Sequence, residues 1–309
     1  KSMRSSPLED QSVTNAIAVG WQDYIALCKL KVVSLIIFTA VVGMFLATPG
    51  MVPWDALIYG TIGIGLAACS AAAINHVVDH KIDSVMARTN RRPLPKGKVS
   101  LLNAIIFAWF LGTISMAILA FLVNPLTAGL TALSLIGYGF IYSMYLKRAT
   151  PQNIVIGGAA GAAPPVLGWT AVTGTLDPNS LLLFLIIFAW TPPHFWALAI
   201  YRRDEYSKVN IPMLPVTHGV EFTRLHILLY TIILFIVTLL PYLVGMSGVF
   251  YLVGAILLGA GFLYYAIRMQ FDNEDRLAMQ TFSFSIIYLM TMFTVLLIDH
   301  YIPLLALML

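Results

Sequence analysis

The stretch WDALIYGTIGIGLAACSAAAINHVVDHKIDSVMARTNRRPLP, residues 54 to 95, joins a long apolar segment to a dense group of charged side chains. Its apolar part has about 20 residues, the length that a helix needs to cross the hydrocarbon core of a bilayer. Only 10% of the whole chain is charged, against about 25% in a soluble domain. The stretch and the composition together predict an integral membrane protein.

Apolar runs of similar length recur along the 309 residues and predict an all-α, polytopic fold with nine transmembrane helices. The expected spans are 30–48, 54–75, 101–122, 126–146, 153–173, 180–201, 226–246, 248–268 and 282–302.

All 18 lysines and arginines fall on one side of this predicted topology. They lie before the first span and in every second loop after it, whereas the alternate loops and the C-terminal tail have none. Short cytoplasmic loops accumulate Lys and Arg, so we expect a cytoplasmic N-terminus and a C-terminus on the opposite side. The basic face suits lipid headgroups or an anionic substrate, and nothing in it points to nucleic acid.

The domain organisation follows from the spans. We expect an N-terminal cytoplasmic or interfacial segment at 1–29, with a candidate surface helix at 13–27, and a single transmembrane domain at 30–309. The two long charged loops follow spans 2 and 6. Segments of about 30–146 and 153–268 are therefore predicted to be parallel repeats with a ninth helix added, and such repeats place a site between the halves.

The end of the second span carries the first candidate site. Asn75, Asp79 and Asp83 recur at every fourth residue, so a helix places them on one face about 6 Å apart. Carboxylate and amide oxygens suit Mg²⁺, which binds through one or two carboxylates together with substrate phosphates. Three arginines, whose planar forks fit phosphate oxygens, follow closely. They are Arg88, Arg91 and Arg92.

The pattern predicts a metal-bridged diphosphate site, although each charge taken alone could equally pair with its neighbours and with lipid. His76 and His80 also stand four apart, on a neighbouring face. No third soft ligand lies near them in the sequence, so we interpret them as hydrogen-bonding or substrate-contact residues rather than as a zinc site.

The NxxxDxxxD stripe that closes the second of nine spans, followed by MARTNRRPLP, resembles the intramembrane prenyltransferases of the UbiA superfamily. The resemblance covers essentially the whole chain. It implies the Mg²⁺-dependent transfer of an isoprenoid group from its diphosphate to an acceptor. It also implies that Asn75, Asp79 and Asp83 hold the metal and the diphosphate, with Arg88 and Arg92 close by.

The second charged loop resembles one branch of that superfamily. TPPHFWALAIYRRDEYSKVNIPMLPV, residues 191 to 216, and KRATPQNIVIGGAAGAAPPVLGW, residues 147 to 169, are similar to the heme O synthases. This branch implies farnesyl diphosphate as donor and heme B as acceptor. Many superfamily members have a second pair of aspartates in this loop. In this sequence His194 stands at about the position of the first aspartate, and the acidic residues, Asp204 and Glu205, come later. A second metal ion held by such a pair is therefore in doubt.

Several residues of this loop receive candidate roles. His194, Tyr201 and Glu205 are spaced for one helical face. A neutral histidine is a usual axial ligand of heme iron, so His194 is the first candidate ligand, and His76 and His80 are the next. Alternatively, because His194 follows two prolines, it could hydrogen-bond a backbone carbonyl that the prolines leave unpaired. By resemblance, Asp204 is the first candidate for steering water. Tyr201, Glu205 and Lys208 are further candidates for the same task or for substrate contact.

Two other functions remain open at this point. An aromatic acceptor, as in quinone biosynthesis, keeps the superfamily but lacks the acidic pair expected in the second loop. An ion-coupled transporter would use intramembrane Asp and His residues, but near the midplane rather than toward one surface. No transit peptide is visible, which favours a bacterial inner membrane with the active site toward the cytoplasm. A heme A synthase or oxidase assembly partner has no support in the sequence.

Overall fold

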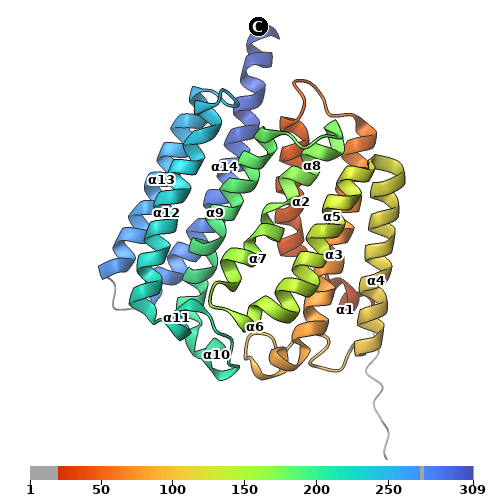
Figure 1. Ribbon diagram of the computed structural model, residues 1–309, viewed down its shortest axis with the longest axis vertical. Coiled ribbons are helices and arrows are strands. Elements are labelled where there is room, and N and C mark those ends of the chain that lie inside the picture. The colour runs from red at the N-terminus through yellow and green to blue at the C-terminus, as the bar shows by residue number, and fades with distance from the viewer. Residues whose placement is uncertain (1–19, 272–274, 309) are drawn as a thin grey trace, which may run out of the picture.

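The computed structural model describes residues 20–271 and 275–308, and the side chains up to residue 303 (Figure 1). Within these ranges the chain is helical and contains no strand. The helices are α1 (Trp21–Leu27), α2 (Leu30–Leu46), α3 (Trp54–Val85), α4 (Leu101–Ile118), η1 (Leu119–Val123), α5 (Pro125–Ile136), η2 (Gly137–Leu146), α6 (Lys147–Ala149), α7 (Asn153–Ala162), α8 (Pro164–Thr173), α9 (Pro178–Tyr201), α10 (Arg203–Lys208), α11 (Leu214–Thr217), α12 (Val220–Leu243), α13 (Val249–Arg268), η3 (Met269–Phe271) and α14 (Arg276–Met308).

The predicted number of spans agrees with these helices. In the described part of the chain, eight helical segments are long and apolar enough to cross a membrane, and α1 with α2 forms a ninth, bent by 56°. Only residues 21–27 of the predicted surface helix are seen as a helix, because residues 13–19 lie outside the described residues. The all-α, polytopic membrane fold is confirmed.

The second span is longer than the sequence predicted. Helix α3 has 32 residues, about 48 Å at 1.5 Å per residue, and continues ten residues beyond the expected end at residue 75. This extension carries the Asn75, Asp79 and Asp83 stripe on a continuous helix. The stripe therefore lies at one end of the helix bundle and not at its middle.

Three other predicted spans are each built from more than one helix. The span expected at 101–122 changes from α4 to the π-helix η1 at Leu119. The span expected at 126–146 changes from α5 to the π-helix η2 at Gly137, and the span expected at 153–173 is divided into α7 and α8 at Ala163. Pro164 and Pro165 follow that break, and a proline inside a helix removes a backbone donor and clashes with the preceding turn.

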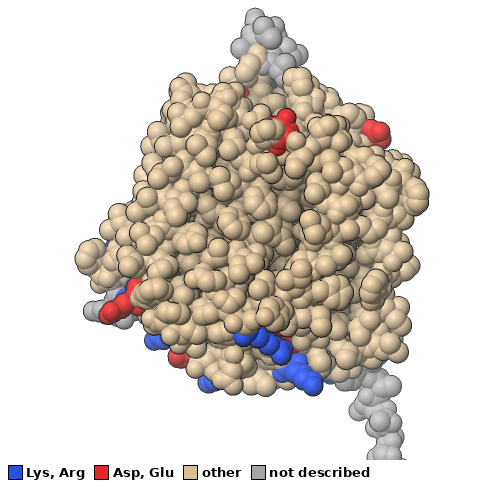
Figure 2. All heavy atoms as spheres, in the orientation of Figure 1, with Lys and Arg blue, Asp and Glu red and all other residues tan. Residues whose placement is uncertain are grey.

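The helices form two groups side by side (Figure 1). Helices α9, α12, α13 and α14 lie on one side, α2 to α5 lie on the other, and α7 stands between them in the view. The loop after α3 lies at the same end of the molecule as α6, α10 and α11. Lys and Arg on the visible face gather at this end, whereas Asp and Glu are seen at both ends (Figure 2). The one-sided distribution of basic residues thus holds on this face of the molecule.

Small residues allow α2 and α8 to pack backbone against backbone. A Cβ atom added at Gly43 would lie under 3.0 Å from the carbonyl of Pro165, and one added at Gly168 would meet the carbonyl of Ala40 equally closely. Helix association in membranes depends on such close approach, because apolar side chains gain little from leaving lipid. This contact fixes the position of α2 relative to the central helices.

Candidate active site

The predicted stripe lies on one buried face of α3. Asn75 is 5% exposed, and Asp79 and Asp83 are each 3% exposed. Burying an ionised carboxylate is costly unless it is paired with an opposite charge. The structure therefore has to provide a cation for each aspartate.

Three cations from three separate segments meet the stripe. Lys147 Nζ lies 2.5 Å from Asp79 Oδ2. Arg92 Nη1 lies 2.6 Å from Asp83 Oδ2. The ammonium of Lys29 donates a hydrogen bond to the Asn75 side-chain oxygen. Arg92 was among the residues predicted from the sequence.

Lys29 and Lys147 are site residues that were not predicted. Each is the lysine at the membrane end of a span, before α2 or after η2, on the side where all basic residues fall. This position in the sequence is the signal by which the two lysines could have been identified as site residues. Lys29 also has left-handed backbone angles, φ 50° and ψ 54°, at the bend between α1 and α2. Such angles cost a non-glycine residue about 1–3 kcal/mol and are often found at functional sites.

The Asn75 amide is held in one orientation. Its nitrogen donates to Asp79 Oδ2 at 3.0 Å and to the hydroxyl of Ser143 at 3.3 Å, which leaves its oxygen for Lys29. The second Asp79 oxygen, Oδ1, is buried and has no hydrogen-bond partner among the described residues. A buried, unpartnered carboxylate oxygen, on the same helix face as a second buried carboxylate and an amide, fits the preference of Mg²⁺ for hard oxygen ligands.

The first and second charged loops meet through an arginine. Arg88 lies close enough to Tyr206, on α10, for its charge to act on the Tyr206 hydroxyl. Burial raises the pKa of the Tyr206 hydroxyl, while the nearby charges of Arg88 and Arg202 oppose that rise. Arg88 and Arg91 are both exposed. Of these two arginines, Arg88 is therefore the one that lies near the second charged loop.

The predicted helical face of the second loop is wrong beyond Tyr201. Helix α9 ends there, because Arg202 leaves the helical region with φ −110° and ψ 18°, and Glu205 belongs to α10. Glu205 lies 2.5 Å from Arg202 Nη1, and its other oxygen is buried with no partner in the described part of the chain. The Asp204 side chain is 87% exposed.

The three candidate histidines differ in their surroundings. His194 Nδ1 lies 2.6 Å from the Ser285 hydroxyl, and the imidazole stacks between Trp190 and Phe282, so the ring links α9 to α14. His80 Nδ1 lies 2.8 Å from the carbonyl of Val77 on its own helix.

His76 has a different environment. It is 2% exposed, and neither ring nitrogen has a hydrogen-bond partner among the described residues. Its place between Asn75 and Asp79 in the sequence puts it beside the stripe. Of the three histidines, His76 is the one with both ring nitrogens buried and unpartnered within the described residues.

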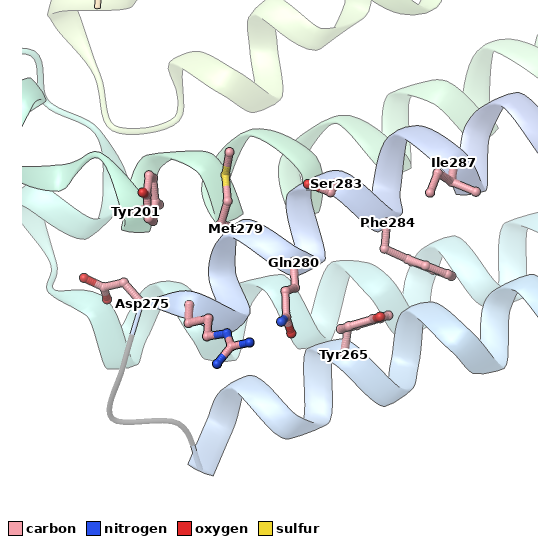
Figure 3. Close-up of a pocket in the computed structure, with 9 residues that line it drawn as sticks. Tyr201, Tyr265, Asp275, Met279, Gln280, Ser283, Phe284 and Ile287 are labelled. Carbon is pink, nitrogen blue, oxygen red and sulfur yellow. The ribbon is translucent and has the colours of Figure 1, made fainter. Parts of the chain in front are cut away.

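A cavity of about 760 Å³ lies elsewhere, between the ends of α9, α13 and α14 (Figure 3). Figure 3 shows Tyr201 and Asp275 toward one end of this cavity and Ile287 toward the other. The structure therefore places Tyr201 here and not at the stripe. Lys208 is exposed at the end of α10. A second, mainly apolar groove of about 440 Å³ runs along η2, α7 and α8 and includes Tyr142 and Gly157.

The sequence pattern that defines the UbiA prenyltransferase family matches residues 36–297. The chain belongs to the UbiA prenyltransferase family. Curated relatives are also prenyltransferases by name. The protoheme IX farnesyltransferase of Methylococcus capsulatus is 62% identical over 93% of this chain and 96% of that relative. The protoheme IX farnesyltransferase of Hahella chejuensis is 59% identical over 94% and 98% of the two chains.

Solved structures of the UbiA prenyltransferase family have the same fold. A digeranylgeranylglyceryl phosphate synthase superposes with a TM-score of 0.77 at 17% identity, over 90% of this chain and 98% of that chain. A UbiA homolog from Archaeoglobus fulgidus, solved with GPP and Mg²⁺ bound, superposes with a TM-score of 0.60 at 17% identity, over 89% and 99%. The family match, the relatives and the candidate spans together make the chain a multi-pass membrane prenyltransferase.

Proposed function

We propose that this prenyltransferase transfers the farnesyl group of farnesyl diphosphate to a vinyl group of heme B and so makes heme O. The observation that carries the proposal is the likeness, at about 60% identity over nearly the whole chain, to relatives named protoheme IX farnesyltransferase. The buried stripe with its three cations is the matching structural feature, because a diphosphate needs a basic site and a metal site together.

Lys29, Lys147 and Arg92 bind the diphosphate in this proposal. In the described structure each is paired with a member of the stripe. Phosphate oxygens are strong acceptors for such cations, so an arriving diphosphate can exchange places with the carboxylates as partner. Asn75, Asp79 and Asp83 would hold Mg²⁺, whose bound charge supplies Lewis-acid stabilisation of the leaving diphosphate.

The transfer requires the C1–O bond of the farnesyl group to break, with its electron pair leaving on the diphosphate. The vinyl π electrons of heme B then form the new bond to C1. Water adds to the vinyl carbon left with positive charge and loses a proton, which gives a hydroxyethylfarnesyl side chain. Preorganised cations stabilise the charge that develops on a leaving group, and Lys29, Lys147 and Arg92 are placed for that task.

On the acceptor side, we propose that His76 contacts heme B, because its ring nitrogens are buried and unpartnered within the described residues. Arg88 and Tyr206 connect the second loop to the stripe. Glu205, with one buried oxygen that lacks a partner in the described chain, is a better candidate than the exposed Asp204 for directing water.

The position of the stripe supports a surface-facing diphosphate site rather than an ion pathway. Asn75, Asp79 and Asp83 occupy the last three turns of α3, at the basic end of the molecule. A diphosphate head arrives from water, whereas ion carriers place their acidic residues toward the midplane. We propose that this end faces the cytoplasm of a bacterial inner membrane, in keeping with the bacterial sources of the relatives and the positive-inside rule.

The proposal is tested by offering the purified protein two acceptors in detergent, heme B and a hydroxybenzoic acid, each with farnesyl diphosphate and Mg²⁺. Chromatography with mass detection should reveal a heme that has gained one farnesyl group and one water. Prenylation of the aromatic acid without any new heme would keep the prenyltransferase and replace the acceptor.

A further inference from the structure

Two stacked tyrosines stand on an unusual helical segment. Tyr138 and Tyr142 belong to the ten-residue π-helix η2, and their ring centroids lie 5.4 Å apart with the planes inclined by 21°. π-helical turns are rare and occur frequently at functional sites. Both side chains are half-buried, so part of each ring surface remains accessible.

The same segment is tied to the stripe at two points. Ser143 accepts a hydrogen bond from Asn75, and Lys147, directly after η2, pairs with Asp79. The charge of Asp79 acts on the phenol groups of both Tyr138 and Tyr142. The two rings therefore lie beside the place where the diphosphate would bind.

A glycine on the neighbouring helix makes room for one ring. A Cβ atom added at Gly157, on α7, would lie 2.3, 2.6 and 3.0 Å from three ring carbons of Tyr142. Four residues further along the same helix, Gly161 has nothing within 4 Å of such an atom. The first glycine of this pair is required by the position of the Tyr142 ring, and the second is not.

We propose that Tyr138 and Tyr142 form an aromatic wall that stabilises the allylic cation created when the farnesyl C1–O bond breaks. The inference rests on the proposed function and adds catalytic residues to it. The faces of aromatic rings are negative and attract a nearby cation, most strongly where water is excluded. Unlike a carboxylate, a ring face offers no anionic oxygen to which the cation would bond.

Binding of a charged mimic tests the wall without requiring turnover. One probe is an aza analogue of the farnesyl cation, in which a protonated amine carries the charge, added with inorganic diphosphate and Mg²⁺. The other is farnesyl thiolodiphosphate, which is uncharged at the corresponding carbons. Dissociation constants are measured for the wild type, Tyr138→Leu, Tyr142→Leu, Tyr142→Phe and Tyr145→Leu. Tyr145 lies on η2 but is 68% exposed, which makes it the matched control.

We expect Tyr138→Leu and Tyr142→Leu to bind the aza analogue about 5- to 30-fold more weakly than wild type, the range expected for loss of a cation–π contact. Their affinity for the thiolodiphosphate should stay within about twofold of wild type, and Tyr142→Phe and Tyr145→Leu should resemble wild type with both probes. Equal loss of both probes, or no loss of the aza analogue, would overturn the proposal. Failure of the wild type to bind the thiolodiphosphate would instead overturn the proposed function.

A second variant pair keeps the test decisive if the Leu variants fold poorly. Gly157→Ala displaces the Tyr142 ring and should weaken binding of the aza analogue selectively, whereas Gly161→Ala should not. Equal affinity for the aza analogue in Gly157→Ala and Gly161→Ala would count against the wall.

Discussion

Lys147 Nζ lies 2.5 Å from Asp79 Oδ2, although 68 residues separate the two in the chain. The contact joins the end of the fourth predicted span to the end of the second. The contact places the Lys147 ammonium, which no nearby sequence motif predicted as a site residue, beside the Asp79 carboxylate. The second oxygen of this carboxylate is buried and has no partner among the described residues.

Replacing Lys147 with Ala should raise the KM for farnesyl diphosphate by about 10- to 100-fold, because hydrogen bonds to charged groups contribute about 1.5–3 kcal/mol. The matched control is Arg148→Ala, since Arg148 is the adjacent, exposed cation. Steady-state kinetics measures both. An equal rise in KM for the two substitutions would mean that binding of the diphosphate depends on the positive charge of this region and not on the Asp79 contact.

Asp79→Ala and Asp83→Ala should each abolish heme O formation while the protein stays folded. Each removes a proposed metal ligand and leaves one cation without its partner. Asp55→Ala is the control, because Asp55 is exposed at the opposite end of α3. Product analysis together with thermal unfolding checks the outcome, and full activity in either stripe variant would remove the proposed metal role.

Removal of divalent metal should weaken binding of farnesyl diphosphate by at least about tenfold and leave heme B binding unchanged. The stripe offers oxygen ligands only, so Mg²⁺ or Mn²⁺ should restore binding and Zn²⁺ should do so poorly. Calorimetric titration after chelation and metal addition measures this. Binding that is indifferent to chelation would contradict the assignment of Asn75, Asp79 and Asp83.

His76 and His194 should respond differently to substitution. His76→Ala should weaken heme B binding by about tenfold, the loss expected for one polar contact with a buried partner. His194→Ala should instead lower thermal stability, because the ring bonds to Ser285 and packs between two aromatic rings. Absorbance titration with heme B and unfolding curves separate the effects. A His194 variant that keeps its stability but loses heme binding would reverse the assignment.

Gly168→Ala should destabilise the fold by about 1–3 kcal/mol or prevent folding, because overpacking forces neighbouring atoms apart. The added carbon would meet the backbone carbonyl of Ala40, which has no rotamer by which to move away. Gly129→Ala, with nothing within 4 Å, is the control and should be neutral or slightly stabilising, since Ala is a better helix former. Chemical unfolding in detergent compares the two variants.

The sequence allowed the membrane fold and the stripe to be predicted because both depend on local spacing. Apolar runs of span length indicated the helices, and a repeat of four residues placed Asn75, Asp79 and Asp83 on one face. Lys29 and Lys147 could not be identified in this way. Their partners lie 46 and 68 residues away, and only the packing of helices brings them together.

Local backbone changes account for the other differences. Periodicity alone continued the helix through Tyr201 to Glu205, but the backbone leaves the helical region at Arg202. The π-helix at Gly137 was likewise not expected, because its residues are as apolar as those of an ordinary span. Both departures lie beside the site, where they alter which side chains face it.

One labelling experiment tests directly whether the stripe supports the formation of heme O. Wild type and Asp79→Ala are incubated with heme B, farnesyl diphosphate and Mg²⁺ in ¹⁸O-labelled water, and the hemes are separated with mass detection. Wild type alone should form a heme carrying one farnesyl group and one hydroxyl oxygen derived from the labelled water. No farnesylated heme with wild type, or equal amounts with Asp79→Ala, would contradict this expectation.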